Sequence, residues 1–309
     1  MGSDKTKRND IRPEAEVKIA VVPVAGLGTR LLPATKSQPK EMLPVAKKPV
    51  VQYVTEELEA NGIEQILFIT GKSKTSIENH FDFDHELIRG LREGGKEELL
   101  AELAFERMGV RFFFTRQRRQ RGLGDAIGCA HYFTADHPFV VALGDSIMGL
   151  EQPSRVVSQM LAVYQENPGS TVIAVEEVPL DRVSRYGIVH PGGEGRVFPI
   201  RALIEKPSPE DAPSNLAIAG RYVLSPSIYD ALAETSPDSG GEVQLTHAIQ
   251  RLLELGESVV GVRLSEKEKR YDIGNFQSYF EAFFDFALAD KELGPDLRQR
   301  LVERLSEDR

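Results

Sequence analysis

The sequence of 309 residues has no tryptophan and a single cysteine, and none of its apolar runs is long. Cys129 alone cannot form an intrachain disulfide, which favours a reducing compartment, and we expect a cytoplasmic protein. The longest apolar runs, such as residues 19–25 and 139–143, are far shorter than the roughly 18 residues that suggest a membrane span. We therefore expect neither a disulfide-stabilised fold nor a membrane partner.

Basic residues are in the minority, with 38 lysines and arginines against 47 aspartates and glutamates, and the formal net charge is −9. An acidic chain repels the phosphates of DNA and RNA at long range, and we expect no nucleic-acid partner. Small phosphorylated substrates are not excluded, because a few local cations can dominate a cleft. Residues 1–10 are polar, without the apolar core of a signal peptide, and we predict a mobile tail over residues 1–16.

Short apolar runs alternate with helical patterns from residue 17 onward. Residues 18–24 form a β-branched run that ends at Gly26, residues 50–61 carry apolar side chains at helical spacing, and residues 63–70 form a second buried-type run. Strand, helix and strand in this order indicate a βαβ crossover. Further strands are predicted at 110–115, 138–143, 171–178, 215–224 and 258–263, and further helices at 74–107, 123–132, 152–166, 226–234, 245–255 and 276–309. The predicted fold is α/β: a Rossmann-like, doubly wound mixed sheet, mainly parallel, with a C-terminal helical tail over 276–309.

The loop after the first predicted strand contains two glycines and an arginine, at Gly26, Gly28 and Arg30. Glycines let the backbone approach a ligand closely and direct its N–H groups at phosphate oxygens, and the arginine adds a fixed fork of donors. Lys40 follows between prolines, which we expect to hold it in an extended segment. The dinucleotide pattern G-x-G-x-x-G is excluded, because Leu31 stands where its third glycine belongs. Since the loop lies at the carboxyl end of a strand, we predict that it binds phosphate.

The residues from Val22 to Tyr53 carry a longer pattern. It comprises Val-Ala-Gly-Leu-Gly-Thr-Arg at 24–30, Leu-Pro-Ala-Thr-Lys at 32–36 and Pro-Lys-Glu-Met-Leu-Pro at 39–44. This pattern resembles the signature of the bacterial UTP–glucose-1-phosphate uridylyltransferases (UDP-glucose pyrophosphorylases), which belong to the sugar-nucleotide pyrophosphorylase family with a glycosyltransferase-A-like fold. Similar blocks follow at 76–81, 205–207, 213–224 and 244–246, so that the resemblance covers nearly all of residues 18–294.

The resemblance implies nucleotidyl transfer, in which a phosphate oxygen of glucose 1-phosphate attacks the α-phosphorus of UTP and yields UDP-glucose and pyrophosphate. Two anions must be brought together, so cations and oriented amides are expected to carry most of the catalysis. Arg30 and Lys40 are implied to neutralise the triphosphate, and Lys206 is implied to align the sugar phosphate. The implied cofactor is Mg²⁺, held by Asp145 and Asp272, because this ion prefers oxygen ligands and takes few from protein when phosphates supply the rest.

The resemblance also implies two substrate sites within one nucleotidyltransferase domain at residues 17–275. The nucleotide-binding half is expected at about 17–150 and the sugar-binding half at about 151–275. The nucleotide is expected to lie against Ala25, Gly26, Leu27, Gly28, Gln117 and Gly122. The sugar phosphate is expected to lie against Gly187, Glu205 and Lys206.

Three positions depart from the family pattern. The family usually has glycine where Arg118 stands, histidine where Asp125 stands, and proline or another residue where Gly144 stands. Four arginines lie within residues 116–121. They form either a solvated basic loop or a cluster that attracts the triphosphate, and the departure bears on the preference for uracil more than on the type of reaction.

Two alternative functions stay open at this point. A glucose-1-phosphate thymidylyltransferase, which uses dTTP, shares the glycine loop, although residues 76–107 and 213–224 resemble the uridylyl branch. A catalytically silent regulator that binds a sugar nucleotide is the second alternative, and the retention of Lys206 and both aspartates argues against it. We also expect a homo-oligomer, a dimer or a tetramer, with the phenylalanine-rich segment 276–286 as a candidate interface.

Overall fold

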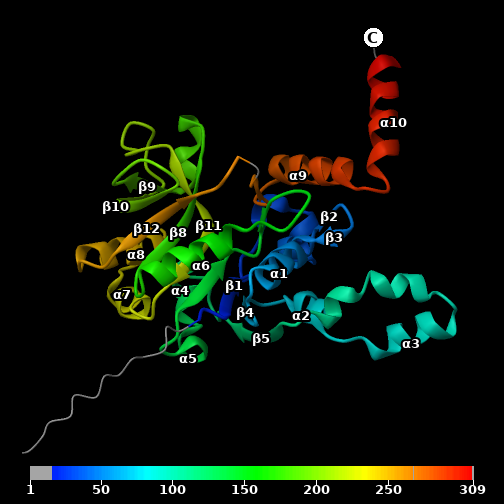
Figure 1. The fold of residues 1–309 in the computed structure, drawn as a ribbon, viewed down its shortest axis with the longest axis horizontal. Coiled ribbons are helices and arrows are strands. Elements are labelled where there is room, and N and C mark those ends of the chain that lie inside the picture. The colour runs from blue at the N-terminus through cyan, green and yellow to red at the C-terminus, as the bar shows by residue number, and fades with distance from the viewer. Residues whose placement is uncertain (1–15, 267, 308–309) are drawn as a thin grey trace, which may run out of the picture.

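The structure, a computed structural model, describes residues 16–266 and 268–307, so that most of the predicted tail over 1–16 lies outside the described residues. Its centre is a nine-stranded sheet with the order β5-β4-β1-β6-β11-β8-β12-β10-β9 (Figure 1). The strands of this sheet are β1 (Ile19–Pro23), β4 (Gln65–Thr70), β5 (Arg111–Arg116), β6 (Phe139–Ala142), β8 (Thr171–Glu177), β9 (Gly187–Pro191), β10 (Val197–Glu205), β11 (Leu216–Leu224) and β12 (Val259–Arg263). The predicted Rossmann-like α/β fold with a mixed sheet is confirmed.

Parallel pairing dominates only the part of the sheet that contains β1. Strand β1 lies between β4 and β6 and is parallel to both, with Val21 opposite Leu67 on one side and Val141 on the other. Such strands are covered on both faces, which explains their continuous apolar sequences. Alternate residues of β1 enter different cores: Val22 packs with α1 (Val50–Ala60) and α6 (Val156–Glu166), whereas Val21 packs in the cluster on the opposite face.

Within the described residues, seven of the nine strands run in one direction, in agreement with a mainly parallel sheet, and β11 and β10 run against them. Within the described residues, four strand pairs of this sheet are parallel and five are antiparallel. One reversed strand is β11, which runs antiparallel to β6 on one side and to β8 on the other. All nine residues of β11 are buried. A strand buried on both faces has the same apolar pattern in either direction, so the sequence did not distinguish the two arrangements.

Helices cover both faces of the sheet, as a doubly wound fold requires. The face that carries the second cluster is covered by α4 (Gly122–Gly128), α7 (Ile228–Glu234) and α8 (Leu245–Glu254). The segment predicted as helical over 74–107 instead divides into two α-helices followed by two short 3₁₀ segments. The helices not yet delimited are α2 (Thr75–Phe81), α3 (His85–Glu93) and α5 (His131–Thr134).

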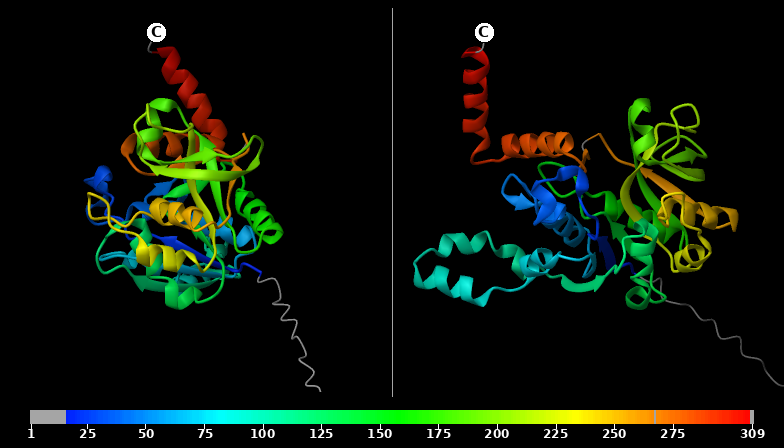
Figure 2. Two further views of the ribbon diagram at one scale, coloured as in Figure 1. Left: turned by 90° about the vertical axis from the view of Figure 1, so that its left-hand side faces the viewer. Right: turned by 180° about the vertical axis from the view of Figure 1, so that it is seen from behind.

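The C-terminal helices differ in how they contact the rest of the molecule. Helix α9 (Phe276–Ala289) buries Ala282 and Phe286 in a third apolar cluster, which also contains Leu31 and Tyr271. Helix α10 (Gly294–Glu307) projects away from the body (Figures 1 and 2), and only Gly294 at its start is buried. The chain bends between the two helices.

Two small sheets accompany the central one. Strands β2 (Pro44–Val45) and β3 (Lys48–Pro49) form a hairpin ahead of α1. Strands β7 (Ser146–Met148) and β13 (Arg270–Asp272) pair antiparallel, with Ser146 opposite Asp272. The second pairing was not predicted, because three-residue strands carry too little periodicity to detect. It joins the segment after β6 to the segment before α9 and thereby helps to form the site described below.

Candidate active site

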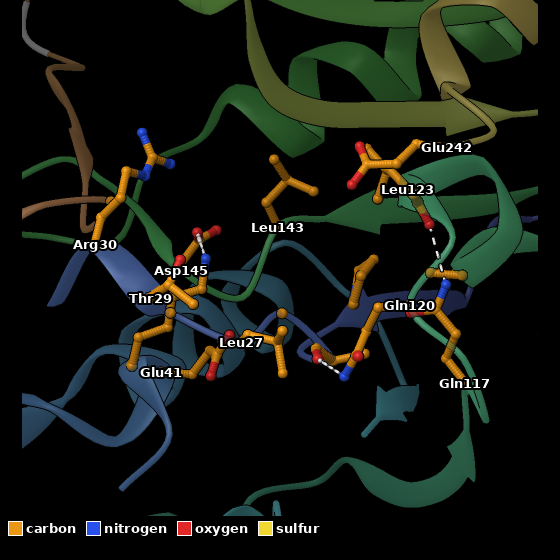
Figure 3. Close-up of a pocket in the computed structure, with 18 of the residues that line it drawn as sticks. Leu27, Thr29, Arg30, Glu41, Gln117, Gln120, Leu123, Leu143, Asp145 and Glu242 are labelled. Atoms are coloured by element: carbon orange, nitrogen blue, oxygen red, sulfur yellow. Dashed lines mark hydrogen bonds and ion pairs between the residues drawn. The ribbon is translucent and has the colours of Figure 1, made fainter. Parts of the chain in front are cut away.

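A cavity of about 520 Å³ opens at the carboxyl ends of β1 and β6 (Figure 3). Ligands of open α/β sheets bind at this edge, because the loops that follow neighbouring parallel strands meet there. Figure 3 shows Arg30 and Asp145 at one end of the cavity and Gln117 and Glu242 at the other. Of the predicted nucleotide residues, the cavity is lined by Ala25, Gly26, Leu27, Gly28, Gln117 and Gly122, together with Arg30 and Lys40.

The glycine loop is shaped around the Lys40 side chain. A Cβ atom added at Gly26 would lie 3.5 Å from Cε of Lys40, so a side chain at this position would contact the lysine. Gly28 has a φ of 66°, in the left-handed region that favours glycine, and its carbonyl accepts a hydrogen bond of 2.7 Å from Oγ1 of Thr35. Arg30 is exposed, and no ion-pair partner for it occurs within the described residues. Its guanidinium is thus available to an anion in the cavity.

Two aspartates lie where the loops meet. Asp145 follows β6 and pairs with the Lys40 ammonium, while Asp272 ends β13. Burial raises the pKa of Asp272, and the charge of Asp145 raises this pKa further. Burial opposes ionisation of Asp145 as well, but Lys40 outweighs it and lowers the pKa of Asp145. The two carboxylates therefore repel each other, a condition that a cation between them would relieve.

The donor chemistry of this pair fits a hard divalent cation that takes its remaining ligands from substrate. Both side chains offer only carboxylate oxygens, the ligands that Mg²⁺ prefers. No group of three or more histidine, cysteine, aspartate or glutamate side chains suited to a metal occurs in residues 16–266 and 268–307. A complete protein cage is thus not built in the described part of the chain. Phosphate oxygens would complete the coordination.

A second cavity, of about 190 Å³, shares Asp145 with the first. The other residues that the two cavities have in common are Leu123, Leu143 and Gln244. The second cavity is smaller than the about 300–1,000 Å³ typical of drug-sized ligand sites, which suits a single sugar ring. Asp272 lines this cavity as well, so the carboxylate pair lies at the junction of the two.

The predicted sugar residues Gly187 and Glu205 line the second cavity. Oε2 of Glu205 accepts a hydrogen bond of 2.7 Å from Oγ1 of Thr246. A Cβ atom added at Gly187 would lie 2.9 Å from both Oγ1 of Thr246 and Cδ1 of Ile218, so a side chain there would have to displace them. Lys206 has a φ of 45°, and its Nζ lies 3.2 Å from Oε1 of Glu205. Its side chain is about half exposed, and within the described chain it borders neither cavity directly.

Several residues of the site had no role assigned from the sequence. Arg270 is buried against Glu176 and Asp272, and its guanidinium lies 4.8 Å from the centre of the Tyr186 ring. Its neighbours in the fold come from distant parts of the chain, so no spacing pattern reveals it. The others are Glu41, Gln120, Gln244 and Thr246. Gln244 and Thr246 lie in the block 244–246 that resembles the family, and Glu41 follows Lys40 in the chain.

The segment 116–122 forms the far end of the first cavity. Gln117 follows β5, and its amide nitrogen donates to the Gly122 carbonyl at 3.1 Å and to Oδ2 of Asp125 at 2.8 Å. Gln120 donates to the Ala25 carbonyl at 3.0 Å and so ties this segment to the glycine loop. Arg118 is exposed and has no ion pair within the described residues, as expected of a solvated basic loop.

Comparison with known proteins places this geometry in a family. Residues 19–287 match the family model described as nucleotidyl transferase. The chain is 44% identical over 294 residues to the UTP–glucose-1-phosphate uridylyltransferase of Streptococcus pneumoniae, covering 94% of this chain and 96% of that protein.

Two solved structures are similar throughout. A UTP-bound UGPase from Acinetobacter baumannii has a TM-score of 0.85 and 36% identity, covering 93% of this chain and 99% of that one. A UDP-glucose pyrophosphorylase complexed with UDP-glucose has a TM-score of 0.78 and 36% identity, covering 87% and 98%. In the described part of the chain, no helix is both long and apolar enough to span a membrane. The chain therefore belongs to the nucleotidyl transferase family, among the UTP–glucose-1-phosphate uridylyltransferases.

Proposed function

We propose that the protein transfers the uridylyl group of UTP to glucose 1-phosphate and releases pyrophosphate. The observation that carries this proposal is the pair of cavities that share Asp145. A nucleotide in the larger cavity and a sugar phosphate in the smaller one would meet at the carboxylate pair. The relatives named above support the choice of substrates, since their names and bound molecules are those of UDP-glucose synthesis.

In the proposed reaction, an oxygen of the sugar phosphate attacks the α-phosphorus of UTP. The bond between the α-phosphorus and the bridging oxygen to the β-phosphorus breaks, and pyrophosphate leaves. Catalysis of this kind rests on positioning and on neutralising charge, because the protein forms no covalent bond. Arg30 and Lys40 would hold the triphosphate and the departing pyrophosphate. Lys206, directed by Glu205, would hold the attacking phosphate in line.

Enzymes of this family generally use a divalent metal. We propose Mg²⁺, with Asp145 and Asp272 as its protein ligands. When bound, the ion supplies positive charge to the phosphate oxygens. Arg270 is in a position to keep Asp272 oriented, since it is buried beside that carboxylate and is itself held by Glu176.

The two substrates are proposed to contact the residues predicted from the sequence. The nucleotide would lie along the glycine loop with its base against Gln117 and Gly122, the end of the cavity away from Arg30 (Figure 3). The hexose hydroxyls would contact Gly187 and Glu205. The nucleotide-binding half at 17–150, the sugar-binding half at 151–275 and the C-terminal segment at 276–309 remain the proposed division of the chain. The single cysteine supports the further proposal of a cytoplasmic location.

We further propose that the chain forms a homo-oligomer, a dimer or a tetramer, through its C-terminal helices. Large apolar side chains of α9 and α10 are exposed, and exposed apolar surface of this kind is typical of interfaces. They are Phe280, Phe283 and Phe284 on α9 and Leu297, Val302 and Leu305 on α10. The molar mass measured by light scattering tests this proposal, and a monomer at micromolar concentration would contradict it.

The release of pyrophosphate tests the proposed reaction. Purified protein is incubated with glucose 1-phosphate, Mg²⁺ and either UTP, dTTP, CTP, ATP or GTP, with and without a chelator. Release with UTP that stops on chelation is the expected result. A clear preference for dTTP would instead favour the thymidylyltransferase, and nucleotide binding without turnover would favour the silent regulator.

A further inference from the structure

The amide of Gln117 has its orientation determined by two groups that can only accept hydrogen bonds. One is the Gly122 carbonyl, 3.1 Å from Nε2, and the other is Oδ2 of Asp125, 2.8 Å from the same nitrogen. A carbonyl and an ionised carboxylate have no proton to donate, so the NH₂ group must face both of them. The opposite orientation would place Oε1 against two acceptors. The amide is therefore held in one of its two possible orientations.

The oxygen of the same amide is left for a ligand. Gln117 is buried, with 5% of its surface exposed, yet it lines the nucleotide cavity. Within the described residues, no protein donor forms a hydrogen bond to Oε1. This oxygen is also not one of the fully buried side-chain atoms that lack a hydrogen-bond partner. Gln117 thus presents a hydrogen-bond acceptor at the end of the cavity opposite Arg30 (Figure 3).

Asp125 is itself held in place from its other oxygen. Nη2 of Arg121 lies 2.9 Å from Oδ1, so each carboxylate oxygen of Asp125 has its own partner. The Gly122 carbonyl belongs to the same first turn of α4, and this turn is packed tightly: a Cβ atom at Gly122 would lie 2.6 Å from the Val243 carbonyl. The chain of contacts runs from Arg121 through Asp125 to Gln117.

We propose that Asp125 is a positioning residue that makes Gln117 accept the N3–H group of a uracil-type base. The inference rests on the proposed function, in which the base lies against Gln117. Uracil and thymine carry a proton on N3, whereas cytosine has a lone pair there. An oxygen held toward the base would bond the first two rings and repel the third. Asp125 therefore sets the discrimination between UTP and CTP, and does not affect the discrimination between UTP and dTTP.

The variant Asp125→Asn replaces the acceptor of the shorter of the two contacts by a donor without changing the shape of the side chain. Arg121 can only donate, so it retains the oxygen of the new amide, and the new NH₂ group faces Gln117. The Gln117 amide is then drawn to turn its own oxygen toward Asn and its nitrogen toward the base. The loss of one well-formed hydrogen bond corresponds to roughly a tenfold change in selectivity.

The test compares kcat/KM for UTP, CTP and dTTP in the wild type, Asp125→Asn and Asp125→Ala. We expect the UTP-to-CTP ratio to fall about tenfold or more in Asp125→Asn, while the UTP-to-dTTP ratio stays within about twofold. A merely structural role would lower activity with all three nucleotides alike, and an unchanged UTP-to-CTP ratio would overturn the inference. In a Gln117→Ala background, Asp125→Asn should leave this ratio unchanged, because the two residues act through one amide.

Calorimetric binding of UTP and CTP separates this inference from the proposed function. If the wild type binds UTP but does not turn it over, the proposed reaction fails, while the ratio of the two dissociation constants still tests Asp125. If the wild type turns over UTP and the ratio does not respond to Asp125→Asn, the inference alone fails. Wild-type protein that binds CTP as tightly as UTP would refute the inference directly.

Discussion

Replacing Arg221 by methionine should destabilise the protein severely, because this arginine is wholly buried. It projects from β11 and has no exposed side-chain surface, and its partner Glu57 on α1 is 2% exposed. Nη2 and Nε reach the two carboxylate oxygens at 2.7 and 3.2 Å, and Nη2 also donates to the Ser146 carbonyl at 2.7 Å. The arginine thus joins β11, α1 and the start of β7, directly beside Asp145.

The expected magnitude follows from what the substitution leaves behind. Arg221→Met leaves the Glu57 carboxylate without an ion-pair partner in the interior. Breaking a buried pair in this way lowers the free energy of unfolding by about 3–5 kcal/mol. Burial raises the pKa of Glu57, and the arginine counteracts this increase. Without the arginine the folded-state pKa of Glu57 should rise further above the unfolded value. The Glu57 carboxyl then keeps its proton in the folded state at pH values where the unfolded chain has released it. The loss of unfolding free energy should therefore grow as the pH rises from about 5 to 8.

Equilibrium urea denaturation measures this change. The double variant Arg221→Met with Glu57→Leu should recover most of the lost stability, because no buried charge remains without a partner. Arg251→Met is the matched surface control: Arg251 pairs with Glu234 in an exposed position, where solvent screens the pair, so its loss should change the free energy of unfolding far less. A loss below about 1 kcal/mol for Arg221→Met, or a double variant as unstable as the single one, would refute the reasoning.

Three further predictions concern the site and the response to pH. Lys206→Ala should raise the KM for glucose 1-phosphate and lower kcat, since the contact is made in both the ground state and the transition state; steady-state kinetics with unchanged values would remove Lys206 from the site. Gly187→Ala should raise the same KM by about tenfold or more while leaving that for UTP nearly unchanged, because the new methyl group would displace Thr246 and with it Glu205; equal effects on both substrates would contradict this assignment. Burial lowers the pKa of His80 below its ordinary value of 6.5, so the unfolded chain takes up a proton first and the free energy of unfolding should fall as the pH drops below about 6.5. The midpoint of thermal denaturation should depend less on pH between 8 and 5.5 in His80→Gln, and identical curves would exclude His80 as the source.

The sequence alone predicted the first strand, the glycine loop and helix α1, because each depends on residues that are neighbours in the chain. The strand at 19–23 is apolar and β-branched, and Gly28 in the loop that follows it has a φ of 66°, which favours glycine. Helix α1 was predicted within one residue at its end, because its apolar spacing is regular and Asn61-Gly62 stops it. The same local pattern carried the family resemblance, and with it the expectation of a uridylyltransferase site.

Tertiary structure alone decided how distant residues meet. Asp145 and Asp272 come together because two three-residue strands pair, and such short strands leave no periodic pattern. The direction of β11 is equally hidden, since a strand buried on both faces looks alike in either orientation. Asp125 departs from the family pattern, and its hydrogen bond to Gln117 emerges only when the start of α4 folds back against the end of β5. Residue types and spacings thus determined which chemistry the chain carries, whereas the packing of the sheet decided which of those groups face one another.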